Sequence, residues 1–460
     1  MIIKRITELI KKLRSLDKET AKKIIYLSSI YALLIFTYST IRPIKDAIFL
    51  AMVGAKFQPI AKLAVMAFSP FFIIFYSAIV TRMNRKRASM SLIGGYAAAC
   101  IALSLACLHP VLGILNTITS PFRILGWTAY ALFDMYPLAV MTCFWALTSS
   151  ISTPDKASTQ YGIMSATSRL GGIIASGFGY IVMKSSMPVY ATIPALTALS
   201  GTMLFATTLL IKSMFKNINK ENLKGYTDQK AGSPTKRKKP GLLEGLKAVV
   251  REPYAFGIFT IFCSYELISA LATFRTQCLI TAQTAHSMQK IGSYVFGYTF
   301  IFQSIGFFIA LFGTTTLPKK LGMKISLLIT PAILFIFSAA LIGNLNLYSL
   351  TAMMIAMKAL NYGFNIPVRE MLFIPTSRNI QFMAKGWIDS FGKTFSKATG
   401  SVMNLASTMP HLSSLSVMLA PISLAISAVW GIIAMALGNK FQNAVKKSEV
   451  IGQKQPKKTH

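Results

Sequence analysis

Charged side chains are scarce in this sequence, and acidic ones are scarcer still. Asp, Glu, Lys and Arg make up 13% of the 460 residues, whereas 53% are hydrophobic. A water-soluble protein of this length needs far more polar side chains to cover its surface. The composition therefore excludes a soluble protein and predicts a chain that lies in the lipid bilayer.

The shortage of acids leaves a strong positive imbalance, with 14 Asp and Glu against 48 Lys and Arg and a net charge of +34. A basic protein can bind nucleic acid, but that requires a folded basic face. Here the cations cluster in short connectors between apolar segments. We therefore expect no nucleic-acid partner, and we expect the connectors to lie near the anionic headgroups of the bilayer.

Cysteine and histidine are also few, and neither is grouped. The five cysteines show no CxxC spacing, and the four histidines are isolated from one another. Disulfides, iron–sulfur clusters and metal sites all need such residues in groups. We expect no disulfide, metal or cofactor.

Long apolar runs dominate what remains. A hydrocarbon core about 30 Å thick is crossed by about 20 helical residues. Twelve segments are long enough, at residues 24–44, 60–81, 88–109, 124–150, 159–183, 189–213, 254–276, 291–313, 323–343, 347–372, 386–408 and 414–438.

The predicted segments form two sets of six, joined by a basic connector that contains Gly, Ser and Pro. This pattern is typical of an all-α integral membrane transporter built from two helical bundles. The predicted regions are a basic N-terminal segment (1–23), a first six-helix bundle (24–213), a basic linker (214–253), a second bundle (254–438) and a basic tail (439–460).

Lysine and arginine are unevenly divided between the two sides of this arrangement. The N-terminal segment, alternate connectors and the tail hold 34 of the 48. The positive-inside rule therefore predicts that both termini are cytoplasmic. The first apolar run lacks a small-residue cleavage site, so we expect it to remain as a helix. No transit segment is evident, and a bacterial inner membrane is the simplest location.

Ionisable residues also occur within the apolar segments. Each costs roughly 2.5–3.5 kcal/mol to insert, so such residues usually face a polar cavity on a substrate path. Cations outnumber anions there by four, and surplus Arg and Lys favour a multiply charged anion such as a phosphate. The cations are Arg42, Lys45, Arg169, Arg275, Lys358, Arg369, Lys385, Lys393 and Lys397, and the anions are Asp46, Asp134, Glu266, Glu370 and Asp389.

The alternative is that some of these groups extend from helix ends to the membrane surface or pair with one another. Arg42, Lys45, Arg275 and Lys397 fit this alternative equally well. Arg169 and Asp134 fall deep inside their segments and fit it less well. The i, i+4 spacing of Lys385, Asp389 and Lys393 predicts one carboxylate between two cations on a helical face that lines the pore.

Two further patterns have plainer interpretations. Gly392-Lys393-Thr394 lacks the upstream glycine spacing and the preceding strand of a phosphate-binding loop, so an ATPase site is not expected. The small residues of the segment at 159–183 predict close helix packing. They are Gly171, Gly172, Ser176, Gly177 and Gly179.

Two motifs are similar to those of a known family. Arg42-Pro43-Ile44-Lys45-Asp46 ends the first segment, and Val368-Arg369-Glu370-Met371-Leu372-Phe373-Ile374-Pro375 is followed by Lys385, Ile388, Asp389, Gly392 and Lys393. Both resemble the nucleotide transporter family, the ATP/ADP antiporters of intracellular bacteria and plastids. The resemblance implies a major-facilitator-like fold and a transporter, not an enzyme, that exchanges ATP for ADP by alternating access.

The resemblance and the charges together select the candidate site residues. Substrate binding is assigned to Arg42, Lys45, Arg169, Arg369, Lys385 and Lys393, and charge pairing or coupling to Asp46, Asp134, Glu370 and Asp389. Asp134 is displaced from the family's fourth-helix glutamate, and Phe274-Arg275 replaces a tryptophan-lysine pair. Two alternatives remain open: proton-driven import of another nucleotide or organic anion, and a membrane protein that keeps the fold without transporting.

Overall fold

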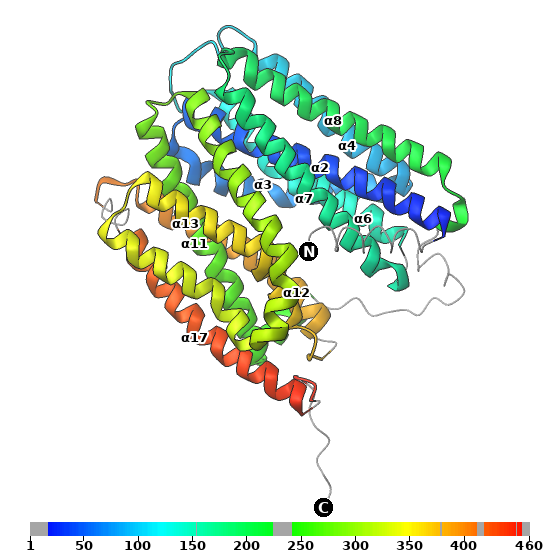
Figure 1. Cartoon of the computed structure of the whole chain (residues 1–460). Coiled ribbons are helices and arrows are strands. Elements are labelled where there is room, and N and C mark those ends of the chain that lie inside the picture. Colours follow the sequence, from blue (N-terminus) through cyan, green and yellow to red (C-terminus); the bar gives the residue numbers. More distant parts are fainter. Residues whose placement is uncertain are drawn as a thin grey trace, which may run out of the picture. The chain divides into compact units, whose positions relative to one another are not determined.

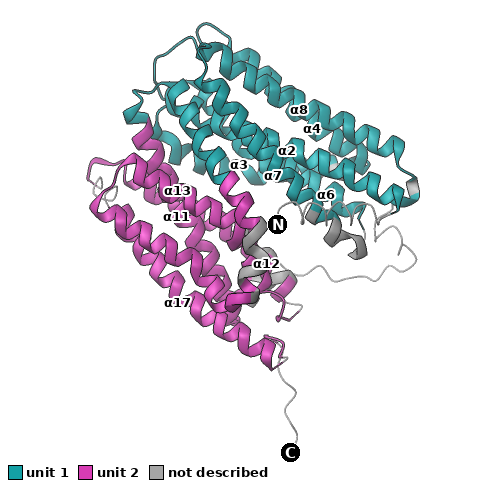
Figure 2. Ribbon diagram, viewed as in Figure 1, with its two compact units in different colours: residues 1–235, 281–303 teal, residues 236–280, 304–460 magenta. Residues whose placement is uncertain are grey.

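The computed structural model describes residues 17–152, 154–223, 242–377, 380–411, 418–447 and 449–452. The chain forms two compact units (Figure 2). Unit 1 contains Met1–Thr235 and Thr281–Gln303, and unit 2 contains Lys236–Ile280 and Ser304–His460. The two six-helix bundles predicted at 24–213 and 254–438 remain a prediction. Residues 1–16, 224–241 and 453–460, which belong to the predicted basic segments, lie outside the described residues.

Unit 1 is built from helices, most of which are labelled in Figure 1. They are α2 (Lys18–Met52), α3 (Gln58–Arg82), α4 (Arg85–Cys107), α5 (Ile124–Tyr136), α6 (Thr142–Ser150), α7 (Pro154–Lys184) and α8 (Val189–Asn217), with the short 3₁₀ turns η1 (Ala55–Phe57) and η3 (Lys220–Leu223). A π-helical turn, η2 (Pro137–Met141), joins α5 to α6. Proline has no backbone N–H for the helical ladder, which is consistent with a change of helical register at Pro137.

Helix α2 is the centre of unit 1, in contact with α5, α7 and α8, while α4 packs along α8. A side chain at Gly171 of α7 would collide with the backbone of Ala32 on α2, and one at Gly179 would collide with the ring of Phe296. Only glycine permits these close approaches. The packing role predicted for the small residues of α7 is confirmed.

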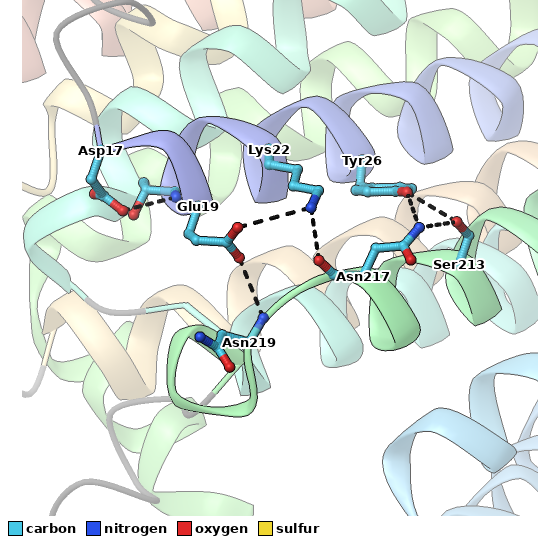
Figure 3. A network of polar contacts seen from close by, with 8 residues as sticks. Asp17, Glu19, Lys22, Tyr26, Ser213, Asn217 and Asn219 are labelled. Atoms are coloured by element: carbon cyan, nitrogen blue, oxygen red, sulfur yellow. Dashed lines mark hydrogen bonds and ion pairs between the residues drawn. The ribbon is translucent and has the colours of Figure 1, made fainter.

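A polar network ties the first turns of α2 to the end of α8 (Figure 3). The ammonium of Lys22 donates to the carbonyl of Asn217 at 2.8 Å, and the hydroxyls of Tyr26 and Ser213 are 2.9 Å apart. Glu19 accepts a hydrogen bond from the backbone N–H of Asn219 at 3.3 Å. These contacts hold the start of α2 against the chain that leaves α8.

Arg123 organises the segment between α4 and α5. Its guanidinium donates to the carbonyls of Asn116 and Ile118, both at 2.8 Å, and to that of Gly113 at 2.6 Å. Partial burial lowers the pKa of Arg123 below its ordinary value. The carbonyls thus replace water as partners of a guanidinium that stays charged at neutral pH.

Unit 2 contains more interrupted helices. They are α10 (Leu242–Arg251), α11 (Pro253–Gln283), α12 (Met288–Gly343), α13 (Leu347–Leu360), α14 (Ile366–Met371), α15 (Lys385–Trp387), α16 (Lys393–Ala406) and α17 (Leu419–Lys446). The unit boundary cuts α11 after Ile280 and α12 after Gln303. Helix α12 covers two predicted segments and is broken at Gly322, whose φ of 77° glycine adopts without strain.

Three π-helical turns occur in unit 2 near the predicted segments at 347–372 and 386–408: two interrupt these segments and one lies between them. They are η4 (Asn361–Asn365), η5 (Ile380–Ala384) and η6 (Ile388–Gly392). The apolar core of unit 2 includes the fully buried residues Trp430 and Tyr254. The hydroxyl of Tyr254 donates to the carbonyl of Leu372 at 2.9 Å. The core thereby fixes the end of α14, which carries Arg369 and Glu370.

Nine helices among the described residues are long and apolar enough to cross a membrane. The predicted segments at 159–183, 347–372 and 386–408 are helical but are not among the nine. The prediction of an all-α membrane protein is confirmed, and the count of twelve crossings stays a prediction.

Candidate functional site

The carboxylate of Asp134 is the centre of a charged cluster in unit 1. The ammonium of Lys45 donates to Asp134 Oδ1 at 2.8 Å, and that of Lys62 lies 3.2 Å from both carboxylate oxygens. The side chains of Lys45, Asp134 and Lys62 are 7%, 17% and 19% exposed. We call this group the Lys45–Asp134–Lys62 cluster.

Further contacts surround Lys45 within the same unit. Its ammonium lies 3.6 Å from the carboxylate of Asp46 and 4.4 Å from the ring centroid of Tyr130. The Tyr130 hydroxyl accepts a hydrogen bond from Gln58 at 3.1 Å. Lys45 therefore has two carboxylates and one aromatic face as partners, which offsets the cost of burying its charge.

Three helices bring the cluster together. Lys45 lies on α2 two residues after Pro43, Lys62 lies in the second turn of α3, and Asp134 lies three residues before Pro137. A π-helical turn begins at Pro137, three residues after Asp134. Such turns often accompany functional sites.

Arg42 lies one turn before Lys45 on α2. It acts electrostatically on Tyr298 of α12, as do Lys45 and Asp46. At 3.6 residues per turn, Arg42 and Lys45 lie within about 60° of each other around α2. Arg42 therefore belongs beside the cluster, on the same helical face.

Arg169 lies elsewhere in unit 1. It is half-buried on α7, where its charge acts on Tyr31 of α2. Tyr31 precedes Lys45 by 14 residues, which corresponds to about 21 Å along a helix. Arg169 is therefore close to α2 but distant from the Lys45–Asp134–Lys62 cluster.

Unit 2 has its own charged group, formed by Arg369, Glu370, Lys385 and Asp389. Arg369 Nη2 lies 3.8 Å from Asp389 Oδ1, and Lys385 forms an ion pair with Glu370. We call these residues the Arg369–Asp389 group. Asp389, Glu370 and Lys385 expose 42%, 38% and 34% of their side chains. The group is thus more open than its counterpart in unit 1.

Arg369 is the buried member of this group, with 9% of its side chain exposed. Its guanidinium lies 4.4 Å from the ring centroid of Phe262, and its Nε is buried without a hydrogen-bond partner. A buried donor without an acceptor is costly, and an entering anion can supply the acceptor.

The predicted stripe of Lys385, Asp389 and Lys393 differs from its expected arrangement. Both lysines interact electrostatically with Asp389. The ion pair of Asp389, however, is with Arg369, and Lys385 forms an ion pair with Glu370. The π-helical turn η6 widens the helix between Lys385 and Lys393, which disturbs the i, i+4 alignment. Each ion pair therefore joins α14, which carries Arg369 and Glu370, to the chain around α15, which carries Lys385 and Asp389.

Three residues at these two groups were not selected as candidates from the sequence. Lys62 lies near the start of the segment predicted at 60–81 and in neither of the two family-like motifs. Tyr130 and Phe262 carried no signal, because aromatic residues are abundant throughout the chain. In the part of the chain that the structure describes, no three or more His, Cys, Asp and Glu are grouped to hold a metal ion.

Comparison with known proteins decides the family. The sequence model described as "TLC ATP/ADP transporter" matches residues 3–363. The chain belongs to the TLC ATP/ADP transporter family. Because this is a family of transporters, the chain is a membrane transporter and not an enzyme, and the predicted family is confirmed.

Two curated relatives of this TLC transporter carry the name "ADP,ATP carrier protein 3". The protein of Rickettsia typhi (strain ATCC VR-144 / Wilmington) is 20% identical over 440 residues, and that of Rickettsia prowazekii (strain Madrid E) is 20% identical over 437 residues. Each alignment covers 84% of this chain and 87% of the relative.

Solved structures of other transporters share the fold of the TLC transporter. A bacterial homologue of the iron transporter ferroportin has a TM-score of 0.59 at 12% identity, covering 91% of this chain and 98% of its own. The nucleoside transporter NupG has a TM-score of 0.55 at 14% identity, covering 90% and 98%. A bacterial homologue of the lysosomal transporter Spinster gives 0.55 at 13%, covering 95% and 100%. The predicted major-facilitator-like fold is confirmed.

Proposed function

We propose that this TLC transporter exchanges nucleotides, ATP for ADP, across the membrane by alternating access. Membership of the family and the names of the two rickettsial relatives support this proposal. The observation that carries it is the Lys45–Asp134–Lys62 cluster, in which two ammonium groups share one buried carboxylate.

The cluster offers a physical mechanism for binding phosphate. Both ammonium groups have three N–H donors each, and one shared carboxylate leaves donors available. Phosphate oxygens that enter between Lys45 and Lys62 accept charge-assisted hydrogen bonds in surroundings of low dielectric constant. The bound polyphosphate then competes with Asp134 for the two lysines.

The same competition favours exchange over one-way transport. When the substrate leaves, Lys45 and Lys62 regain Asp134 as their shared counter-ion. Reorienting the empty carrier keeps two mutually repelling ammonium groups buried beside one carboxylate. In the loaded carrier, phosphate oxygens between the two ammonium groups relieve that repulsion. A lower barrier for the loaded state couples export of one nucleotide to import of another.

Unit 2 supplies further candidates for the same substrate class. Arg369, Lys385 and Lys393 are the cations, with Glu370 and Asp389 as pairing residues. The unpaired Nε of Arg369 supports this assignment.

We further infer that the chain lies in a bacterial inner membrane with both termini in the cytoplasm. The distribution of Lys and Arg between alternate connectors supports this orientation. The basic termini and linker would then contact anionic headgroups.

Uptake by purified protein in vesicles tests the proposed function. Vesicles loaded with ADP should accumulate labelled ATP, and unloaded vesicles should accumulate far less. Lys45→Ala should abolish most of the uptake. Lys212→Ala is the matched control, because this exposed lysine of α8 lies outside the cluster. The absence of nucleotide uptake in loaded wild-type vesicles would refute the proposal.

A further inference from the structure

An aromatic group surrounds Tyr31 in unit 1. The rings of Tyr31 and Phe144 are stacked, with centroids 5.1 Å apart and an interplanar angle of 3°. Trp145 presents its ring edgewise to Tyr31 at 5.3 Å, and Tyr161 lies 5.4 Å from Trp145. These residues come from α2, α6 and α7. Arg169, which is also on α7, interacts electrostatically with Tyr31.

The members of this group differ in exposure. Phe144 is fully buried, whereas Trp145 exposes 37% of its surface and Tyr31 is half-buried. Phe144 therefore supports the ring of Tyr31 from behind, while Trp145 retains an open surface.

The position of Tyr31 on α2 indicates that the exposed surface of Trp145 faces a polar path. Tyr31, Arg42 and Lys45 lie within about 60° of one another around α2, at 3.6 residues per turn. Charged side chains within a membrane face the interior or a water-filled cavity. Arg169 acts electrostatically on Tyr31, and Trp145 contacts the Tyr31 ring, so both aromatic residues are placed on the charged side of unit 1.

The chemistry of the group suits a flat heterocycle better than a phosphate. Aromatic side chains stack on bases of any sequence, because every base has a π-face. The planar guanidinium of arginine donates to ring nitrogens and carbonyl oxygens at a base edge. A phosphate would gain one cation here and nothing from the rings, whereas the Lys45–Asp134–Lys62 cluster offers it two.

We propose that Tyr31, Trp145 and Arg169 form the subsite that receives the base of a purine nucleotide. This inference rests on the proposed nucleotide exchange. The phosphates extend from this subsite along α2 in the direction of Arg42. The Lys45–Asp134–Lys62 cluster, about 21 Å from Tyr31 along the helix, is a separate position on the same path. Arg169, assigned from the sequence to general substrate binding, then determines which base is accepted.

Competition for uptake tests this assignment. Uptake of labelled ATP into ADP-loaded vesicles is measured against unlabelled ATP, GTP, CTP, UTP and inorganic tripolyphosphate. Trp145→Ala and Arg169→Met should each raise the inhibition constant of ATP about tenfold and reduce its advantage over UTP, with little change for tripolyphosphate. Trp145→Phe, which keeps a stacking face, should restore most of the preference.

Two controls keep the test decisive. Phe205→Ala removes an exposed aromatic residue of α8 and should leave every inhibition constant unchanged. All variants are compared at equal amounts in the vesicle membrane. A wild-type protein that fails to distinguish purines from pyrimidines, or variants that keep the wild-type ratio of ATP to UTP inhibition, would overturn the subsite. Failure of the proposed function is distinct, because wild-type vesicles would then accumulate no nucleotide.

Discussion

The charged groups of the two units differ in how firmly their carboxylates are held. In unit 1, Asp134 is bound by two ammonium groups at 2.8 and 3.2 Å and exposes 17% of its side chain. In unit 2, Asp389 lies 3.8 Å from Arg369 and exposes 42%. A tight buried group cannot lose one member without leaving an uncompensated charge, whereas a loose pair with an exposed carboxylate can change partners.

This difference implies unequal roles for the two groups. Breaking the Lys45–Asp134–Lys62 cluster leaves buried charges uncompensated, so folding and transport should fail together. Breaking the Lys385–Glu370 pair of the Arg369–Asp389 group leaves both members partly hydrated, so transport should change with little loss of stability. Three comparisons of variants test this contrast.

The largest effect is expected from Asp134→Asn. Removing one partner of a buried pair typically costs about 3–5 kcal/mol, and here two lysines lose their shared carboxylate. We expect a clear fall in the melting temperature in detergent and loss of ATP uptake. Glu370→Gln is the matched control, because Glu370 and its partner Lys385 are both partly exposed, and it should cost less than about 1 kcal/mol. Equal destabilisation by the two changes would contradict the comparison.

A smaller effect separates the two lysines of the cluster. Lys45 is 7% exposed and also contacts Asp46 and Tyr130, whereas Lys62 is 19% exposed. A hydrogen bond to a charged group contributes about 1.5–3 kcal/mol, or roughly tenfold to a hundredfold in affinity. We expect ATP to raise the melting temperature in detergent less in Lys45→Met than in Lys62→Met. The reverse order would make Lys62 the principal phosphate ligand.

The smallest effect is expected from Arg369→Lys in unit 2. The change keeps the charge but replaces the planar guanidinium over Phe262, an interaction of about 0.5–2 kcal/mol. The apparent KM for ATP should rise several-fold while the melting temperature stays near that of the wild type. Arg251→Lys, at an exposed position of α10, is the control. A large fall in the melting temperature would show that Arg369 is structural.

Much of the fold is readable from the sequence because the membrane constrains it. A long apolar run must be helical in lipid, since its backbone groups have no other partners. The segment predicted at 124–150 coincides with the span from α5 to α6. The π-helical turns were not predictable, because they depend on packing around Pro137 and around the charged residues of unit 2.

The candidate site was only partly predictable. The depth of Asp134 in its segment and the motif around Lys45 identified two of the three members of the unit 1 cluster. Lys62 was missed, since hydrophobic periodicity indicates which face a residue occupies and not which helix lies opposite. Arg169 was recognised as an intramembrane cation, but its aromatic neighbours Tyr31 and Trp145 became apparent only in the folded chain.

The sequence by itself determined that this protein lies in the membrane, that it is helical and that it belongs to a family of transporters, because composition and motifs are local properties. Only the tertiary structure decided which cations share which carboxylate. Lys45 and Lys62 lie 89 and 72 positions from Asp134 along the chain. In surroundings of low dielectric constant an unpaired charge is costly, so buried charges pair with one another. The packing of the helices determines which charges are close enough to pair.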